Sequence, residues 1–243
     1  MDRVPASHFK RTVLALLIFG TAFGYLEAAV VTYLRALHEP ARQQFYPGRP
    51  PAELFPLLTL DQLRTGGTEQ QSLLIAEIGR EAATIIMLAA IALAVARDAG
   101  EWAAAFVFTF GVWDIVFYAS LKLLLDWPAS LFTWDILFLI PVPWAGPVLA
   151  PVLVSVAMIA AAVFHLWAQA NDRPVRMGTT HWCGILLGAL VIIVAFAMDY
   201  RHIMAGGVPR EFNWGVFVIG IGGSVGSYFR AARQSREHTP SVG

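Results

Sequence analysis

The sequence predicts an all-α, polytopic membrane helix bundle that forms a single domain over residues 1–243. Hydrophobic residues make up 57% of the chain and charged residues only 14%, whereas soluble domains carry about 25% charged residues. Several apolar runs also reach about 20 residues, the length that crosses roughly 30 Å of hydrocarbon as a helix. A proline-rich segment interrupts this pattern. Together these features predict a membrane protein with one irregular element.

About six transmembrane helices are expected. The apolar runs lie at roughly 12–34, 75–96, 102–123, 145–167, 182–200 and 213–229. The first run is too long for the apolar part of a signal peptide, so we interpret it as a retained span. Residues 36–68 form a proline-rich and then amphipathic outer loop, which is typical of an interfacial cap. Thr68 and Gln71 fit a capping box, so the second helix is expected to start there.

The basic residues predict the orientation. Six spans place both termini on one side, and that side carries Arg3, Lys10, Arg11, Arg97, Arg173, Arg176, Arg230, Arg233 and Arg236. The positive-inside rule therefore places both termini in the cytoplasm and the protein in the cell (inner) membrane. The margin is modest, because the outer loop contains Arg42, Arg49 and Arg64.

The segment FTWDILFLIPVPWAGPVLAP, residues 132–151, is unsuited to a plain membrane helix. Its prolines remove backbone donors, and each one biases the preceding residue away from helical geometry. Irregular backbone at membrane depth is tolerated only where protein or a water-filled cavity surrounds it. Residues 128–145 are therefore predicted to form a re-entrant or interfacial segment, in which Asp135 lines a pocket.

Carboxyl groups inside the spans are the main functional signal. A charged side chain at the bilayer centre costs about 2.5–3.5 kcal/mol, so such groups usually face the interior of a bundle. With a rise of about 1.5 Å per residue, Glu27 and Glu81 each lie roughly 24 Å from the inner boundary, and Asp114 about 18 Å. Asp199 has a similar depth but lies beside Arg201 at an interface. Glu27, Glu81 and Asp114 are therefore expected to share one pocket in the outer half of the bilayer.

Neighbouring side chains extend this predicted site. Tyr118 and Lys122 follow Asp114 at intervals of four, so all three would share one helical face. The residues expected to contact a substrate are Trp113, Tyr118, Trp134, Asp135, Arg80 and Lys122. The alternative is purely structural: the charges could pair across helices, and the tryptophans could form an aromatic belt.

The preferred functional hypothesis is a membrane-embedded enzyme that performs acid/base chemistry on a lipid or isoprenoid-like substrate. Carboxyl groups in apolar pockets tend to have raised pKa values and can act as general acids. Aromatic faces stabilise cationic intermediates. Glu81 and Asp114 would then be the acid and base, with Glu27 as an orienting partner and Asp135 in a supporting position.

Two other hypotheses remain open. One is a transporter or binding protein for a cation, a metal or a small molecule; a divalent cation would use Glu27, Glu81, Asp114 and His202. The other is an accessory subunit without catalytic activity. Gly20 with Gly24, and Gly222 with Gly226, match the small-residue spacing of closely packed helices and could also serve an oligomer. The neutral net charge argues against a nucleic-acid partner.

Overall fold

The chain is an all-α helix bundle with one small β-hairpin. The computed structural model describes residues 6–50, 53–65 and 67–237. Its elements are α1 (Ala6–Phe45), α2 (Leu60–Thr65), α3 (Thr68–Val95), α4 (Ala99–Leu125), β1 (Trp134–Phe138), β2 (Trp144–Pro147), α5 (Leu149–Ala170), α6 (Thr179–Ala197), α7 (Tyr200–Met204) and α8 (Trp214–Glu237).

Within the described residues, five helical segments are long and apolar enough to cross a membrane. They are Phe9–Phe45, Gln70–Val95, Ala99–Leu125, Leu149–Ala170 and Thr179–Met204. They correspond to the first five predicted spans. The sixth predicted span, 213–229, is helical as part of α8, but α8 is not among the five. Its polar C-terminal half carries three arginines, which lowers its hydropathy.

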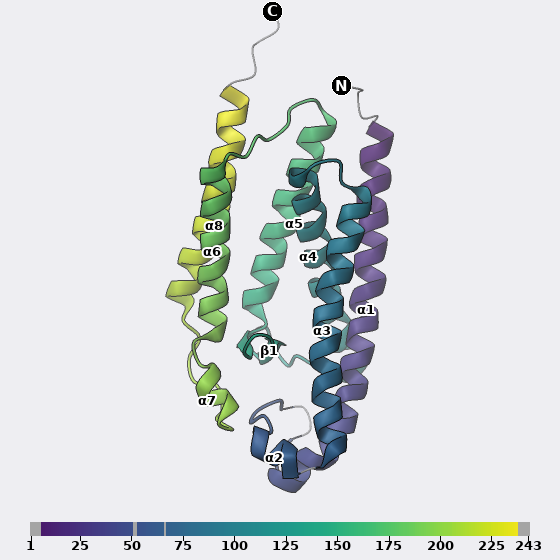
Figure 1. The fold of residues 1–243 in the computed structure, drawn as a ribbon, viewed down its shortest axis with the longest axis vertical. Coiled ribbons are helices and arrows are strands. Elements are labelled where there is room, and N and C mark those ends of the chain that lie inside the picture. Colours follow the sequence, from purple (N-terminus) through teal and green to yellow (C-terminus); the bar gives the residue numbers. More distant parts are fainter. Residues whose placement is uncertain (1–5, 51–52, 66, 238–243) are drawn as a thin grey trace, which may run out of the picture.

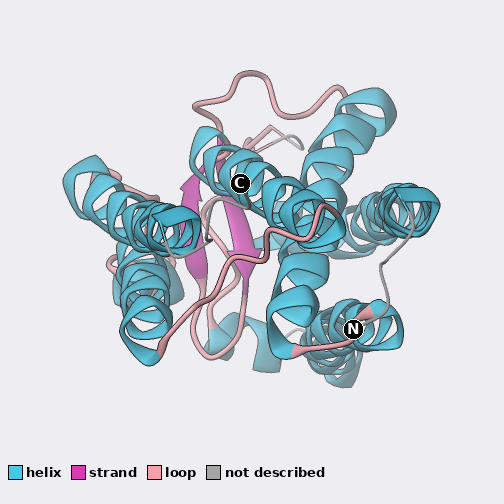
Figure 2. Cartoon of the chain, turned by 90° about the horizontal axis from the view of Figure 1, so that it is seen from above, coloured by secondary structure: helices cyan, strands magenta, loops and turns pink. Residues whose placement is uncertain are grey.

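The helices form two groups with the hairpin between them. One group contains α1, α3, α4 and α5, with α1 packed along α4 and α4 along α5; the other is the pair α6 and α8. The described part of α1 begins, and that of α8 ends, at the same end of the bundle, whereas α2 and α7 lie at the opposite end (Figure 1). The view along the bundle places both strands between the helix groups (Figure 2).

The first helix is longer than predicted. The outer loop was expected to begin at residue 36, but α1 continues to Phe45 and contains Pro40. The wrong boundary arose because charged residues after position 34 were interpreted as loop. The start of α3 at Thr68 is as predicted, but the capping box is absent, because Gly67 occupies the N-cap and no side chain caps the helix.

As predicted, residues 128–145 do not form one straight helix. The β-hairpin to which they contribute was not predicted. Asp135 lies in β1, where it pairs with Gly146 of β2 in an antiparallel hairpin. Gly146 lies against α6, because a Cβ there would be 2.6 Å from a ring carbon of Phe196. The hairpin delays the start of α5 to Leu149, four residues after the predicted start.

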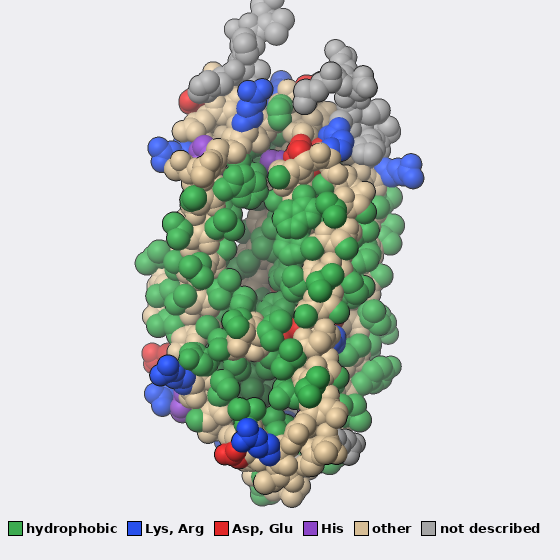
Figure 3. All heavy atoms as spheres, in the orientation of Figure 1, with side chains coloured by type: hydrophobic (Ala, Val, Ile, Leu, Met, Phe, Trp, Pro, Cys, Tyr) green, Lys and Arg blue, Asp and Glu red, His purple; other side chains and the backbone are tan. Residues whose placement is uncertain are grey.

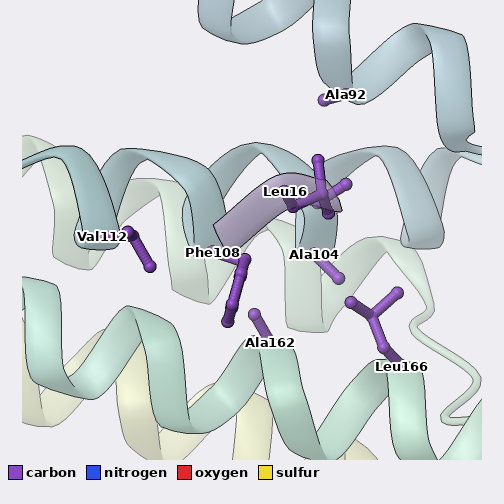
Figure 4. Close-up of a cluster of buried hydrophobic side chains, with 8 residues drawn as sticks. Leu16, Ala92, Ala104, Phe108, Val112, Ala162 and Leu166 are labelled. Carbon is purple, nitrogen blue, oxygen red and sulfur yellow. The ribbon is translucent and has the colours of Figure 1, made fainter. Parts of the chain in front are cut away.

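Close packing of α1, α4 and α5 supports the wall on which the site is built. Leu16, Phe108 and Leu166 belong to one buried cluster that joins these helices (Figure 4). A Cβ on Gly24 would be 2.6 Å from the carbonyl oxygen of Trp113, so α1 approaches α4 through a glycine. The predicted role of Gly20 and Gly24 is therefore confirmed. Gly222 and Gly226 do not pack this way, since a Cβ at either position would meet nothing within 4 Å.

Gly24→Ala is expected to lower the melting temperature of the detergent-purified protein. The added methyl group would collide with backbone, and such overpacking costs about 1–3 kcal/mol. Gly222→Ala is the matched control, because its methyl group meets open space and alanine favours a helix by about 1 kcal/mol over glycine. Equal melting temperatures for the two variants would contradict the close α1–α4 contact.

Candidate functional site

A large cavity of about 560 Å³ lies inside the bundle. Its walls come from α1, α3, α4, α5, α6 and the hairpin, and leucines of the segment 53–65 line it at the α2 end. In the space-filling view the surface is hollowed between α3 and α6 and is bordered mostly by hydrophobic side chains (Figure 3). The cavity is therefore mainly apolar and lies behind a hollowed lateral surface of the bundle.

Most of the predicted site residues lie on this cavity. Those that line it are Glu27, Arg80, Glu81, Trp113, Asp114, Tyr118 and Asp135. Glu27, Glu81, Asp114 and Asp135 are also buried, each with no more than 7% of its surface exposed. The carboxyl groups from α1, α3 and α4 thus share one cavity, because their helices surround the same space.

Three predicted site residues do not line the cavity. Lys122 is exposed and pairs with Asp126 just after α4 (Nζ–Oδ1, 2.7 Å), so the expected polar stripe ends at Tyr118. Trp134 packs edge-on against Phe212. His202 lies in the short helix α7, where its Nε2 is 3.1 Å from the carbonyl oxygen of Val208.

The first polar group on the cavity wall, which we call the Arg80 cluster, joins α1 to α3. It comprises Glu27, Glu77, Arg80, Glu81 and Thr84. The Arg80 guanidinium forms ion pairs with Glu27 and with Glu77, and its Nε donates to Glu77 at 2.9 Å. Thr84 Oγ1 lies 3.3 Å from a Glu27 oxygen. Among the described residues, Arg80 therefore pairs with both Glu27 and Glu77, one cation between two carboxyl groups, and forms no ion pair with Glu81.

Glu81 connects α3 to the segment after β1. Both of its carboxyl oxygens lie 2.9 Å from the backbone nitrogen of Leu139, which donates to them. Within the described chain, no lysine, arginine or histidine nitrogen comes within the 4.0 Å of an ion pair to Glu81. The hydrogen bond therefore fixes the position of the carboxyl group without neutralising it.

The second polar group, the Asp135 cluster, comprises Arg35, Asp114, Tyr118, Asp135 and Ser155. Ser155 of α5 donates to Asp114 at 2.8 Å, and the Tyr118 hydroxyl donates to Asp135 at 2.9 Å. Like Glu81, Asp114 has no cationic partner within 4.0 Å among the residues that the structure describes. Four elements thus meet at this cluster, with β1 carrying the central carboxyl group.

Asp135 lies on β1, outside the five apolar helical segments. Burial raises the pKa of its carboxyl group to about 6, while the charge of Arg35 and the hydrogen bond from Tyr118 oppose that rise. A buried charge loses hydration, which favours the protonated acid. Asp135 therefore changes charge close to neutral pH and interacts electrostatically with Asp114.

Three basic residues on α1 were not predicted to belong to the site. Arg35, His38 and Arg42 all line the cavity, and their spacing of three and four residues places them on one helical face. The signal was present in the sequence but was assigned to a loop. Arg35 also lies over the ring of Trp127, with its guanidinium carbon 4.1 Å from the ring centroid.

The predicted metal ligands are not assembled into a site. Across residues 6–50, 53–65 and 67–237, no group of three or more His, Cys, Asp or Glu side chains is placed to hold a metal ion. His202 is absent from the cavity wall, and Glu27 is engaged by Arg80.

Comparison with known proteins gives no match to a family model, to a curated protein or to a solved structure.

Proposed function

We propose that this chain is a membrane-embedded enzyme that binds a lipid-like substrate in the cavity and uses Glu81 and Asp114 as its acid and base. One observation carries the proposal. Glu81 and Asp114 are buried on the wall of a mainly apolar cavity, and neither forms an ion pair among the described residues, although the Arg80 charge acts on Glu81 from further away. Glu27, by contrast, forms an ion pair with Arg80, which suits the orienting role that the sequence suggested.

The chemistry follows from this division of roles. A carboxyl group that is shielded from water and unpaired can carry a proton at neutral pH and deliver it to a substrate. Glu81 accepts hydrogen bonds from the backbone of Leu139 and Ile140, and Asp114 accepts one from Ser155 Oγ. A fixed position keeps the group oriented towards a bound reactant, and such orientation is a large part of catalytic rate enhancement.

The size and lining of the cavity favour a lipid-like substrate. Its volume of about 560 Å³ lies within the roughly 300–1,000 Å³ that is usual for small-molecule sites. Aromatic rings of α4 line it, namely Phe106, Phe110, Trp113 and Phe117. The hollow between α3 and α6 faces sideways (Figure 3), so an apolar molecule could enter from the hydrocarbon layer. Aromatic faces would also stabilise a cationic intermediate.

A test of this proposal starts from the lipids that accompany the protein. We expect purified protein to retain one lipid species above its share in the membrane extract. Incubation of that species with the protein should convert it to a product visible by liquid chromatography and mass spectrometry. Retention of a random lipid mixture, with no species altered, would contradict an enzyme of this kind.

The membrane orientation belongs to the same proposal. The basic residues near the ends of the spans favour cytoplasmic termini, and the described ends of α1 and α8 lie at one end of the bundle (Figure 1). The α2 end would then face the outside of the cell membrane. The Arg80 and Asp135 clusters would lie in the outer half of the bilayer.

Binding or transport of a cation is the second candidate, and a charge imbalance favours it. Six carboxyl groups line the cavity, namely Glu27, Glu39, Glu77, Glu81, Asp114 and Asp135, against the three guanidinium groups of Arg35, Arg42 and Arg80. A proton or an organic cation would offset this imbalance. Transport would be favoured over catalysis if the purified protein retained no lipid and if proteoliposomes took up a cation in a flux that Glu81→Gln abolishes.

A further inference from the structure

Arg35 is the cavity arginine whose charge is least compensated. Arg80 pairs with two carboxylates and Arg42 with one, Glu39 at 3.4 Å. Arg35 has neither an ion pair nor a hydrogen bond within the described part of the chain, and its contact is the stacking on Trp127. The stacked ring fixes the plane of the guanidinium, which leaves its N–H edge free for a ligand.

Asp135 is the carboxylate whose charge acts on Arg35, but other groups hold it. Asp135 interacts electrostatically with Arg35, but it accepts hydrogen bonds from the Tyr118 hydroxyl and the Ile136 backbone. No ion pair joins Asp135 to Arg35, so the carboxyl oxygens lie more than 4.0 Å from the guanidinium nitrogens. The hairpin therefore holds Asp135 back from the guanidinium.

Within the described part of the chain, the buried polar side-chain atoms of the cavity wall that have no hydrogen-bond partner are all donors. They are Nε of Arg35, Nε of Arg42, Nε1 of Trp113 and Nε1 of Trp144. Arg80 Nη1 differs, since it forms the ion pair with Glu27. A buried donor without a partner is destabilising, so a ligand rich in acceptor oxygens would be stabilised by hydrogen bonds from these donors.

The position of Arg35 suits a polar headgroup. Arg35 and Arg42 are two turns apart on α1, with His38 between them, and all three lie towards the α2 end of the cavity. Glu27 lies eight residues earlier, roughly 12 Å deeper along the helix. Asp135 interacts with both Arg35 and Asp114, so a group bound at Arg35 would lie close to the proposed acid/base residues.

We infer that the lipid-like substrate carries an anionic headgroup, a phosphate or a carboxylate, which binds to Arg35 and Arg42. Guanidinium groups bind both anions in a bidentate geometry. The apolar part of the molecule then extends past Glu81 and Asp114 towards Phe106 and Phe110. This inference rests on the proposed function, because it specifies the substrate of the same cavity.

The test is a lipid titration of the detergent-purified full-length protein, read by native mass spectrometry. The probes are phosphatidic acid, an anionic phosphate monoester, and phosphatidylcholine, a zwitterionic phosphodiester, with identical acyl chains, so that only the headgroup differs. We expect phosphatidic acid to bind about tenfold tighter or more, as a charged hydrogen-bonded contact provides. Arg35→Gln and Arg42→Gln should each reduce this preference to about threefold or less. Arg49→Gln is the control, because Arg49 pairs with exposed Glu53 and does not line the cavity.

The outcomes separate this inference from the proposed function. Equal binding of the two lipids, or an unchanged preference in Arg35→Gln, would overturn the anionic headgroup while leaving a lipid-binding cavity. Failure of both lipids to bind would instead contradict the proposed function. Inorganic phosphate is the last probe. If it displaces phosphatidic acid only at concentrations where its ionic strength alone would do so, the result supports a lipid headgroup. Arg35-dependent phosphate binding without lipid binding would overturn the lipid and identify a free anion.

Discussion

Glu81→Gln and Asp114→Asn should each lower lipid turnover by about 100- to 10,000-fold, the range that positioned acid and base groups contribute. Both substitutions keep a carbonyl oxygen, so Leu139 N–H and the Ser155 hydroxyl retain an acceptor. What they remove is the transferable proton. The melting temperature should therefore change by only a few degrees, which differential scanning fluorimetry of the purified variants would measure.

Two further variants distinguish catalysis from a structural role. Glu81→Leu removes the acceptor as well as the proton, so it should lose both turnover and stability because Leu139 N–H is left unsatisfied. Glu53→Gln, at an exposed position outside the cavity, should change neither. If Glu81→Gln kept its turnover, or lost it only in proportion to a lower melting temperature, Glu81 would be a structural residue.

Arg80→Met should produce the largest loss of stability. It leaves the buried Glu27 and the half-buried Glu77 beside a side chain without charge, and breaking a buried ion pair costs about 3–5 kcal/mol. The side chains of Arg80 and Glu27 are only 21% and 7% exposed. Arg49 and Glu53 are 45% and 49% exposed, so Arg49→Met should cost about 0–1 kcal/mol.

A double-mutant cycle would measure the Arg80–Glu27 coupling directly. Glu27→Gln in the Arg80→Met background removes the uncompensated charge, so the double variant should be less destabilised than the sum of the single variants. The free energies come from reversible unfolding in mixed detergent. Additive effects, or a cost for Arg80→Met no greater than that for Arg49→Met, would contradict the Arg80 cluster as the junction of α1 and α3.

The membrane bundle could be predicted from sequence because apolar runs of spanning length are a strong local signal. Helix ends that contain polar residues were harder to predict. Pro40 and the charges around it suggested a loop, yet α1 continues to Phe45. The hairpin around Asp135 has no clear sequence signature, because its strands are short and its pairing depends on packing against α6.

The placement of Glu27, Glu81 and Asp114 on one cavity followed from a general constraint, since buried charges seek a shared polar interior. Their individual partners did not follow from it. Whether Arg80 pairs with Glu27 or with Glu81 depends on how α1 and α3 are rotated against each other, and no single sequence records that rotation. Arg35 was missed because its importance arises from Trp127 and Asp135, which reach it only through the fold.

The most direct measurement is a high-resolution density map of the full-length protein in nanodiscs made from native lipid extract. The proposed function predicts an elongated density in the cavity that passes Glu81 and Asp114, and the inferred headgroup site predicts that its polar end lies at Arg35. A cavity filled only by water or by rearranged side chains, with Glu81 and Asp114 each paired to a cation of the protein, would contradict a lipid-binding acid/base site.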